Sequence, residues 1–326
     1  MKTAECVAPG HPDKVCDQIS DAILDECLRQ DPRTRAGIEV LGGHGVFVVT
    51  GELTTDAFVY MDQVAKKVYR EIGYQEDVGV MVNVVSQSPD IAQGVDTGGA
   101  GDQGIMIGYA TAENKAMIPQ ELFLARDILN HLPKGFGPDA KSQVTLDDEG
   151  EVDTIVISAL HKPGASFKPL EDLAKKYKPK KIHINPTGTF TIGGIAADAG
   201  LTGRKLAVDN YGPQIPVGGG CFSGKDPSKV DRSGAYMARK IACDLVREGN
   251  AVALVKIAYS IGVAEPVMAT AHVQMKASDE AREINLLKDR SYHLKPKEII
   301  EQLDLRKPIY QKTASHGHFG HGFIWD

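Results

Sequence analysis

Positive side chains of this chain concentrate in glycine-rich stretches. Arg204 and Lys205 end the turn DAGLTGRK, and Lys225 and Lys229 lie in the stretch GGGCFSGKDPSK. Backbone amides freed by glycine, placed beside an arginine fork and lysine point charges, suit a phosphate chain. Carboxylates stand near both stretches, so a metal ion that bridges such a chain fits the same pattern. A solvated basic turn or a flexible surface loop explains either stretch alone, and only their sum predicts a site for a metal-bound polyphosphate.

The sequence GHPDK, which begins at Gly10, opens a predicted helix. Unpaired amides and the positive end of the helix dipole favour an anion at such a helix start. His11 and Lys14 would add hydrogen-bond donors there, and Asp13 could hold a metal ion. An ordinary N-terminal cap with solvated charges is the alternative for this motif. Lys141, at the start of a later predicted strand, is a weaker cation candidate of the same kind.

Two known nucleotide-binding patterns are present only in part. GAGDQG, from Gly99, satisfies G-x-G-x-x-G, but it precedes the alternating run IMIGYAT instead of opening a helix, so we exclude a dinucleotide-binding fingerprint. The run from Gly219 to Lys225 satisfies G-x-x-x-x-G-K, yet Asp226 and Pro227 follow where a magnesium-binding hydroxyl and a helix are needed. The second run is therefore not a standard phosphate-binding loop, although its amides and its lysine still suit phosphate.

The histidines near the C-terminus invite a zinc interpretation. His316, His318 and His321 form the pattern H-x-H-x-x-H. No carboxylate or cysteine lies close to them in the sequence, and three glycines are interspersed, so we favour a docked irregular tail over a zinc site. Other histidines have no informative spacing and carry no prediction: His131, His161, His183, His272 and His293.

The composition excludes several classes of protein. The 326 residues carry 43 acidic and 37 basic side chains, a net charge of -6, and 42% of them are hydrophobic. This ordinary composition supports a full core, and the negative charge predicts no general affinity for nucleic acid. We find no apolar stretch of membrane-spanning length and no signal peptide, so we expect a cytoplasmic protein that binds no membrane. The five cysteines are odd in number and lack metal-binding spacing, which predicts reduced thiols.

Apolar periodicity predicts the order helix, strand, strand, helix, strand along the chain, repeated at a spacing of roughly a hundred residues. The first round is expected at 12–29, 36–41, 45–53, 58–72 and 79–85. The second round is expected at 118–131, on both sides of Glu149-Gly150, at 169–177 and at 180–184. The third round shows the start of the pattern, at 230–248, 252–261, 265–275 and 295–303.

These rounds predict an α+β fold of three pseudo-repeated α-β-β-α-β units, 1–97, 98–192 and 193–326, between which the chain could interleave. Helices would cover one face of each sheet, and the other face would pack on another unit or on a partner subunit, so we expect an oligomer. The glycine-rich segments 86–104 and 193–229 are long for simple connections, which predicts functional loops.

Short motifs along nearly the whole chain resemble, in order, those of the S-adenosylmethionine synthetase (methionine adenosyltransferase) family in a bacterial-type, somewhat shortened form. They are GHPDK, GELTT, QSPDIAQGVD, GAGDQG, DAKSQVT, INPTGTFTIGG, DAGLTGRK, GGGCFSGKDPSKVDRS, YSIGVAEP and GHFG. The resemblance implies the family's three-unit fold and an enzyme that forms S-adenosyl-L-methionine from ATP and L-methionine. It implies sulfur attack on C5′ of ATP, then hydrolysis of the triphosphate to phosphate and diphosphate. It also implies a homodimer or a tetramer with active sites between subunits.

The same resemblance assigns site residues by motif. Catalytic roles fall on His11, Lys141, Asp198, Arg204, Lys205 and Lys225. Further ATP contacts are expected from Asp139, Thr189, Phe190 and Cys221, with Phe190 stacking on adenine. Methionine is expected to contact Glu52, Gln87, Asp102, Asp198 and Lys229. Two Mg²⁺ ions would bind Asp13 and Asp231, and one K⁺ ion would bind Glu39.

The chain departs from the family pattern at a few positions. Thr189 stands where an arginine is common, Cys221 replaces a small residue and His316 replaces an aromatic residue. The loop between Gln87 and Gly99 is shorter than in familiar bacterial members, as are stretches of the central unit.

Three questions stay open on the sequence. The thiol of Cys221, beside Lys225, could have a lowered pKa and react with oxidants, whereas a buried inert thiol is the alternative. The cation-bearing loops would serve a Mg²⁺-dependent ATPase or kinase equally well. A nucleotide-binding protein without turnover is the third possibility.

Overall fold

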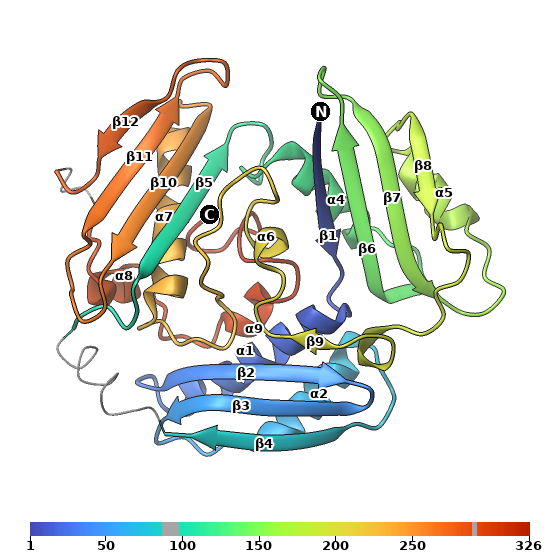
Figure 1. The fold of residues 1–326 in the computed structure, drawn as a ribbon, viewed down its shortest axis with the longest axis horizontal. Coiled ribbons are helices and arrows are strands. Elements are labelled where there is room, and N and C mark those ends of the chain that lie inside the picture. Colours follow the sequence, from blue (N-terminus) through green and yellow to red (C-terminus); the bar gives the residue numbers. More distant parts are fainter. Residues whose placement is uncertain (87–97, 289–291) are drawn as a thin grey trace.

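The computed structural model describes residues 1–86, 98–288 and 292–326, so the expected methionine contact Gln87 lies outside the described residues. Three four-stranded sheets stand around a centre that contains the long helix α1 (Pro12–Gln30) (Figure 1). Helices and strands both contribute heavily, and the predicted α+β class is confirmed. Within the described residues, no helix is both long and apolar enough to cross a membrane.

The first sheet has the strand order β4-β3-β2-β9. Its strands are β2 (Arg35–Gly43), β3 (Val46–Thr54), β4 (Gly79–Val85) and β9 (Gly200–Leu201). β2 and β3 form the predicted antiparallel hairpin, and β4 runs parallel to β3 after helix α2 (Met61–Ile72). The strands and helices of this first round therefore appear in the predicted order, with α1 packed on β2 and α2 packed on β4 and α1.

The second sheet repeats this plan. It contains β6 (Phe136–Leu146), β7 (Val152–His161) and β8 (Lys181–Ile184), with β1 (Lys2–Val7) as an added outer strand. β6 and β7 are antiparallel, and β8 is parallel to β7. Helix α4 (Gln120–Asn130) packs on β1 and β6, and α5 (Lys168–Lys175) packs on β8.

The third sheet departs from the plan at its end. It contains β5 (Gly104–Thr111), β10 (Val252–Tyr259), β11 (Met268–Gln274) and β12 (Arg282–Asn285). Helix α7 (Val230–Arg247) covers β5 and β10, and α8 (Pro296–Gln302) packs on α7. β12 is antiparallel to β11 and precedes α8, so this round has its last strand before its second helix instead of after it.

Each sheet receives one strand from a distant part of the chain. β1 pairs with β6, β5 pairs with β10, and β9 pairs with β2. The sequence pattern predicts only β5, because β9 has two residues and β1 lacks strict alternation of polar and apolar residues. The sheets are therefore interleaved along the chain, while the unit boundaries stay a prediction.

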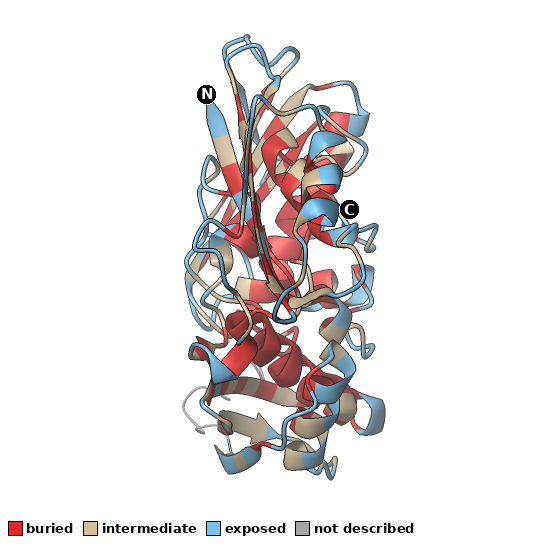
Figure 2. Ribbon diagram, turned by 90° about the vertical axis from the view of Figure 1, so that its right-hand side faces the viewer, coloured by how far each residue is buried: buried red, intermediate tan, exposed pale blue. Residues whose placement is uncertain are grey.

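Helix α1 is buried on almost every side. The apolar face predicted for it is buried, as its pattern requires: Val15, Ile19, Ala22, Ile23 and Cys27. The charged face, which the periodicity assigns to solvent, is buried as well, because loops from other parts of the chain cover Asp17 and Asp21. Figure 2 shows the same arrangement, with buried residues concentrated in the helices inside the molecule and exposed residues at its outer turns.

Gly108 on β5 has no room for a side chain. A Cβ atom there would lie 2.0 Å from the carbonyl carbon and oxygen of Ala238 on α7. We predict that Gly108→Ala lowers the free energy of unfolding by about 1–3 kcal/mol, the usual cost of overpacking. Urea unfolding at fixed protein concentration measures the loss. The control is Gly79→Ala, whose Cβ would contact Val46 at an ordinary 3.7 Å, and equal losses for the two variants would contradict the prediction.

Candidate active site

Four aspartates stand at every fourth position of α1 and therefore lie on one face of the helix. All four are buried, and each accepts backbone N–H groups from segments far away in the sequence. The pairs are Asp13 with Leu201, Asp17 with Gly203, Asp21 with Gly224, and Asp25 with Tyr310 and Gln311, at distances of 2.8 to 3.0 Å. This aspartate row holds the turn after β9 and the glycine-rich stretch before α7, which carry the predicted cations.

Arg204 and Lys205 follow β9 and reach Asp13. The ammonium of Lys205 donates a hydrogen bond to Asp13 Oδ2, and Arg204 Nε lies 3.5 Å from Asp13 Oδ1. Burial alone would raise the pKa of Asp13, but these contacts and the Leu201 N–H more than offset burial and hold the pKa below its ordinary value. Asp13 is thus a fixed carboxylate with two cations beside it.

Lys14 does not add a hydrogen-bond donor at the start of α1, which is the role that the sequence predicts for it. Its ammonium is fully buried, 2.9 Å from Asp17 and 2.6 Å from Asp209 at the end of α6 (Leu206–Asp209). The prediction that Lys14 offers a donor to an anion is therefore wrong, because its charge is used inside the protein between two carboxylates.

His11 is the N-terminal cap of α1, and its Nδ1 accepts the backbone N–H of Asp13 at 3.2 Å. Burial and the charges of Lys205 and Lys141 lower the pKa of His11 to about 3. The ring is therefore neutral near pH 7, and because Nδ1 is an acceptor, its proton lies on Nε2. His11 can donate one hydrogen bond, and it has no proton to release at neutral pH.

Strand pairing brings β6 beside this helix start. Ala8 and Gly10 donate backbone hydrogen bonds to the Ala140 and Pro138 carbonyls, at 2.8 and 3.3 Å. Lys141, whose side chain is exposed, follows on the same strand and acts electrostatically on His11. Pairing of distant strands therefore joins GHPDK to DAKSQVT, a juxtaposition that neither motif specifies alone.

Asp139 joins the same group of charges. Its Oδ2 accepts the Gly194 N–H at 2.8 Å, in the short 3-10 helix Gly194–Ala196. Burial raises the pKa of Asp139 to about 6, against the lowering effects of Gly194 and Lys141. Asp198, two residues beyond that short helix, is exposed and contributes to the fields at both Asp139 and His11.

Phe190, the expected adenine-stacking residue, is held by its backbone. Its N–H donates to His161 Nε2 at 3.0 Å, and its carbonyl accepts the His161 N–H at 2.9 Å. The His161 ring in turn packs edge-on against Phe167. His161 carries no informative spacing in the sequence, yet it fixes the backbone next to the exposed Thr189.

Lys225 and Asp231 form the centre of a second group. Lys225 Nζ lies 2.5 Å from Asp231 Oδ2, and the backbone at Lys225 bridges to Gly37 of β2. Burial alone would lower the pKa of Lys225, but Cys221 and Asp231 raise it above its ordinary value, as does Asp102. Gly220 packs directly on the Asp231 carboxylate, where a Cβ atom would lie 2.1 Å from Cγ, so this position requires glycine.

Other expected residues surround the second group. Lys229 pairs with Asp226, whose Oδ2 also accepts the Ala36 N–H at 2.8 Å. Asp226, which breaks the phosphate-loop pattern, is thus a buried anchor to β2. Glu39 on β2 and Glu52 on β3 are partly exposed, and burial raises the pKa of Glu39 while Lys225 lowers it.

Burial raises the pKa of the Cys221 thiol to about 11, although Lys225 acts to lower it. The predicted lowering of the Cys221 pKa is therefore wrong, because removing the thiol from water outweighs the neighbouring cation, and whether the thiol reacts with oxidants stays a prediction.

The expected site residues thus form two groups within one chain. The first contains His11, Asp13, Asp139, Lys141, Asp198, Arg204 and Lys205, and the second contains Asp102, Cys221, Lys225 and Asp231. Among the described residues, no hydrogen bond or ion pair links a side chain of one group to a side chain of the other. The groups adjoin where Gly203 faces Cys221, since a Cβ on Gly203 would lie 2.6 Å from the Cβ of Cys221.

Family models match consecutive parts of the chain. The N-terminal, central and C-terminal domains of S-adenosylmethionine synthetase match residues 1–93, 97–190 and 192–326. An S-adenosylmethionine synthase of Wolinella succinogenes is 45% identical, with 99% of this chain and 94% of the relative covered. The chain belongs to the S-adenosylmethionine synthetase family.

Other synthases named in the same way show the same likeness. Those of Nitratiruptor sp. and Helicobacter hepaticus are 44% and 43% identical, again over 99% of this chain and 94% of each relative. The resemblance and the enzyme class predicted from the motifs are confirmed. The Wolinella alignment extends over 364 residues whereas this chain has 326, so that relative carries segments that this synthetase-family chain lacks. Where the shortening lies stays a prediction.

Asp21 and Arg232 are the main residues to which the sequence analysis assigns no role, although Arg232 lies within the motif GGGCFSGKDPSKVDRS. Arg232, in the first turn of α7, donates to both carboxylate oxygens of Asp21 at 2.7 Å and to the Lys225 carbonyl at 2.9 Å. Both side chains are fully buried, and the guanidinium lies 4.2 Å from the centre of the Tyr310 ring. The pair holds Gly224 through its N–H and Lys225 through its carbonyl. The sequence signal for Asp21 is that aspartates stand at every fourth position of the helix, a pattern that normally indicates a solvated helix face.

The C-terminal tail docks on this buried pair. The hydroxyl of Tyr236 accepts from Arg232 Nε at 3.0 Å and lies 2.8 Å from His318 Nδ1. The indole N–H of Trp325 donates to the His318 carbonyl at 2.8 Å. Burial lowers the pKa of His316 to about 4, so its ring is neutral. The docked irregular tail predicted from the glycines is confirmed.

We predict that His11 stays neutral far below the pH at which an exposed histidine gains a proton. Because burial and cations disfavour the imidazolium, its NMR titration should have a midpoint below about pH 5, against an ordinary pKa of about 6.5. The His11→Asn spectrum assigns the signal. Since the unfolded chain binds this proton first, His11 should lower stability as the pH falls below about 6.5. A midpoint near pH 6.5 in the folded protein would contradict the assignment.

We predict that Asp21→Asn lowers the free energy of unfolding by about 3–5 kcal/mol, because it leaves the Arg232 charge buried without its partner. Urea unfolding at fixed protein concentration measures this loss. The matched control is Asp244→Asn on the same helix as Arg232, which breaks a partly exposed pair with Lys240 and should cost less than about 1 kcal/mol. A loss at Asp21 as small as the control's would show that the buried pair is not a principal anchor.

Proposed function

We propose that this chain forms S-adenosyl-L-methionine from ATP and L-methionine and then hydrolyses the triphosphate to phosphate and diphosphate. The observation that carries this proposal is the pairing of a cation with a carboxylate in each group, Lys205 with Asp13 and Lys225 with Asp231. A Mg²⁺-bound triphosphate needs both partners, since its oxygens bind ammonium groups and its metal ions bind carboxylates. Each cation lies next to the carboxylate that a metal ion would use.

The first step is attack of the methionine sulfur on C5′ of ATP, which forms the C–S bond and breaks the C–O bond to triphosphate. A thioether sulfur has no proton to lose, so this step requires no general base, and a neutral His11 fits that requirement. Catalysis then comes from alignment and from donors placed where negative charge develops on the leaving oxygen. His11 Nε2–H, Lys141, Arg204, Lys205 and Lys225 would supply those donors.

The carboxylates fit the metal ions that the family implies. Within the described part of the chain, no cluster of three metal-ligating side chains exists, so each Mg²⁺ would take one carboxylate, Asp13 or Asp231, together with phosphate oxygens and water. Bound Mg²⁺ supplies charge neutralisation for the phosphates. Glu39, partly buried and near Lys225, would contribute a carboxylate oxygen to K⁺.

The residues proposed to contact methionine, the sulfonium product and adenine are assigned by the same reasoning. Asp102 belongs to the second group, Glu52 and Lys229 border it, and all three are proposed to bind methionine, with Gln87. The product is a sulfonium cation, and the exposed Asp198 would stabilise its positive charge. Phe190, held by His161, would stack on adenine next to Thr189, which offers a hydroxyl in place of an arginine.

A second subunit would complete each site. The outer face of the first sheet carries Glu39 and Glu52, and it also exposes large apolar side chains: Leu41, Val46, Met81 and Val85. An exposed apolar face of this kind favours a partner protein. We propose that two copies pack through this face, so that the first group of one chain meets the second group of the other, in a homodimer or a tetramer. A cytoplasmic location stays a prediction.

We predict that Lys141→Met lowers kcat by about a hundredfold or more while ATP still binds, because it removes a proposed leaving-group donor at an exposed position. Steady-state kinetics and ATP titration measure the two effects. Lys134→Met, at another exposed lysine before the same strand, is the control and should keep normal turnover. Near-normal turnover of Lys141→Met would remove Lys141 from the mechanism.

The proposed reaction itself is tested with purified protein, ATP, L-methionine, Mg²⁺ and K⁺. Mass spectrometry should detect S-adenosylmethionine together with phosphate and diphosphate, and all three should require methionine. ATP loss without methionine and without a sulfonium product would identify an ATPase instead. ATP binding with no product in either sample would identify a nucleotide-binding protein.

A further inference from the structure

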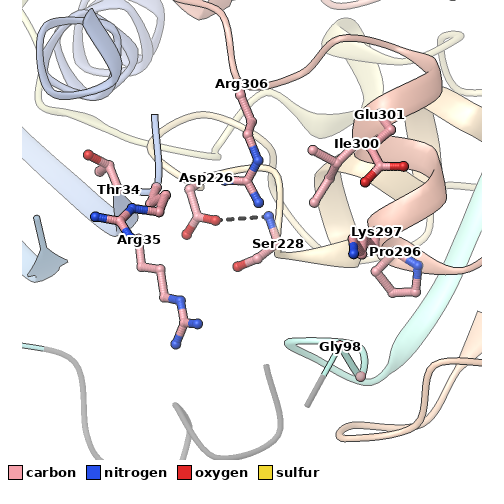
Figure 3. Close-up of a pocket in the computed structure, with 12 residues that line it drawn as sticks. Thr34, Arg35, Gly98, Asp226, Ser228, Pro296, Lys297, Ile300, Glu301 and Arg306 are labelled. Atoms are coloured by element: carbon pink, nitrogen blue, oxygen red, sulfur yellow. Dashed lines mark hydrogen bonds between the residues drawn. The ribbon is translucent and has the colours of Figure 1, made fainter. Parts of the chain in front are cut away.

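A cavity of about 480 Å³ lies beside the turn that carries Lys225 and Lys229, and Asp226 and Ser228 of that turn are among its lining residues. It opens between α8, the turn that precedes α7 and the residues that lead into β2. This volume is in the range of small-molecule sites. Figure 3 shows side chains from these separate segments, among them Arg35, Lys297 and Arg306, around one opening.

Cations outnumber available acids in this cavity. Arg33, Lys297 and Arg306 line it together with two carboxylates, Asp226 and Glu301, and Arg35, which already interacts with another group, lines it as well. The Asp226 carboxylate is already used, because it pairs with Lys229 and accepts the Ala36 N–H. In a chain with a net charge of -6, such a local excess of positive charge favours an anionic ligand.

Arg33, Lys297 and Arg306 keep hydrogen-bonding capacity for a ligand. Among the described residues, the ion pairs of Arg33 are long, 3.9 Å to Asp31 and 3.8 Å to Asp56. Arg306 donates from Nη1 to the Pro32 carbonyl at 2.8 Å, which leaves its other N–H groups for a ligand. Lys297 is exposed and, within 1–86, 98–288 and 292–326, has no ion-pair partner.

The wall of the cavity adds a hydroxyl and an apolar surface. The backbone N–H of Ser228 donates to Asp226 Oδ1 at 2.8 Å, as the dashed line in Figure 3 marks. The Ser228 hydroxyl oxygen is shielded from solvent and has no hydrogen-bond partner among the described residues. Pro296 and Ile300 line the cavity with apolar groups.

We propose that this cavity binds a small anion with two or more phosphate groups, either free or carried by a nucleoside, at a site separate from the catalytic phosphates. Arginine forks bind phosphate oxygens with two hydrogen bonds, and several cations from separate segments suit several charges on one ligand.

Isothermal titration of inorganic diphosphate into the full chain tests this proposal. The background variant Lys205→Ala with Lys225→Ala weakens the catalytic loops, and Mg²⁺, ATP and methionine are left out. We expect one diphosphate site per chain in this background. Adding Lys297→Gln and Arg306→Gln should weaken it by about tenfold or more, since both charges are lost. Lys297 is exposed and Arg306 has one exposed hydrogen bond to the Pro32 carbonyl, so the melting temperature should change little.

The matched control adds Lys67→Gln and Arg70→Gln, two exposed cations on α2, and should leave diphosphate affinity unchanged. Absence of binding in the background variant, or equal affinity with and without the cavity substitutions, would overturn the proposal. An equal weakening by the control would also overturn it, since the attraction would then be general. ADP in the same titration separates the two ligand sources: equal affinity identifies the phosphates alone, and tighter binding identifies an added nucleoside contact.

Discussion

The buried aspartate row on α1 is the interaction on which the candidate site depends. Asp13, Asp17 and Asp21 each take one backbone N–H from a cation-bearing segment, and Asp25 takes two from the segment at α9 (Tyr310–Thr313). Burying a carboxylate costs free energy unless hydrogen bonds and cations compensate it. Moving these loops away from the helix would remove that compensation. One rigid helix therefore sets the positions of two loops that are glycine-rich.

The same row explains why the loops can be so rich in glycine. Their order does not come from side chains of their own, because carboxylates of α1 and the Asp21–Arg232 pair hold their backbones from outside. Glycine can then stand where the backbone approaches another group closely, as at Gly220 beside the Asp231 carboxylate. The charges that remain, on Lys205 and Lys225, are each fixed next to one carboxylate. Such preorganised charges cost little reorganisation when a phosphate chain arrives.

The sequence predicts the long, periodic elements well, and it predicts the family from its motifs. α1, the β2–β3 hairpin and α7 lie close to their expected bounds because their apolar spacing is strong. It does not predict β1, β9 or β12, since short strands are specified by the partner strand and not by their own pattern. For the same reason the junction of His11 with Lys141 is not apparent from either motif. The buried state of Lys14 and of the α1 carboxylates also escapes prediction, because solvated and buried charged faces have the same spacing.

The central claim is that each site joins the first group of one chain to the second group of another. Two inactive variants, Lys205→Ala and Lys225→Ala, test it when they are unfolded together, refolded as a mixture and assayed for S-adenosylmethionine. In a mixed dimer one site carries both substitutions and the other carries neither. Random pairing should therefore restore about a quarter of the native activity. If each site lay within one chain, every site would retain a substitution, and a mixture no more active than its separate components would contradict the account.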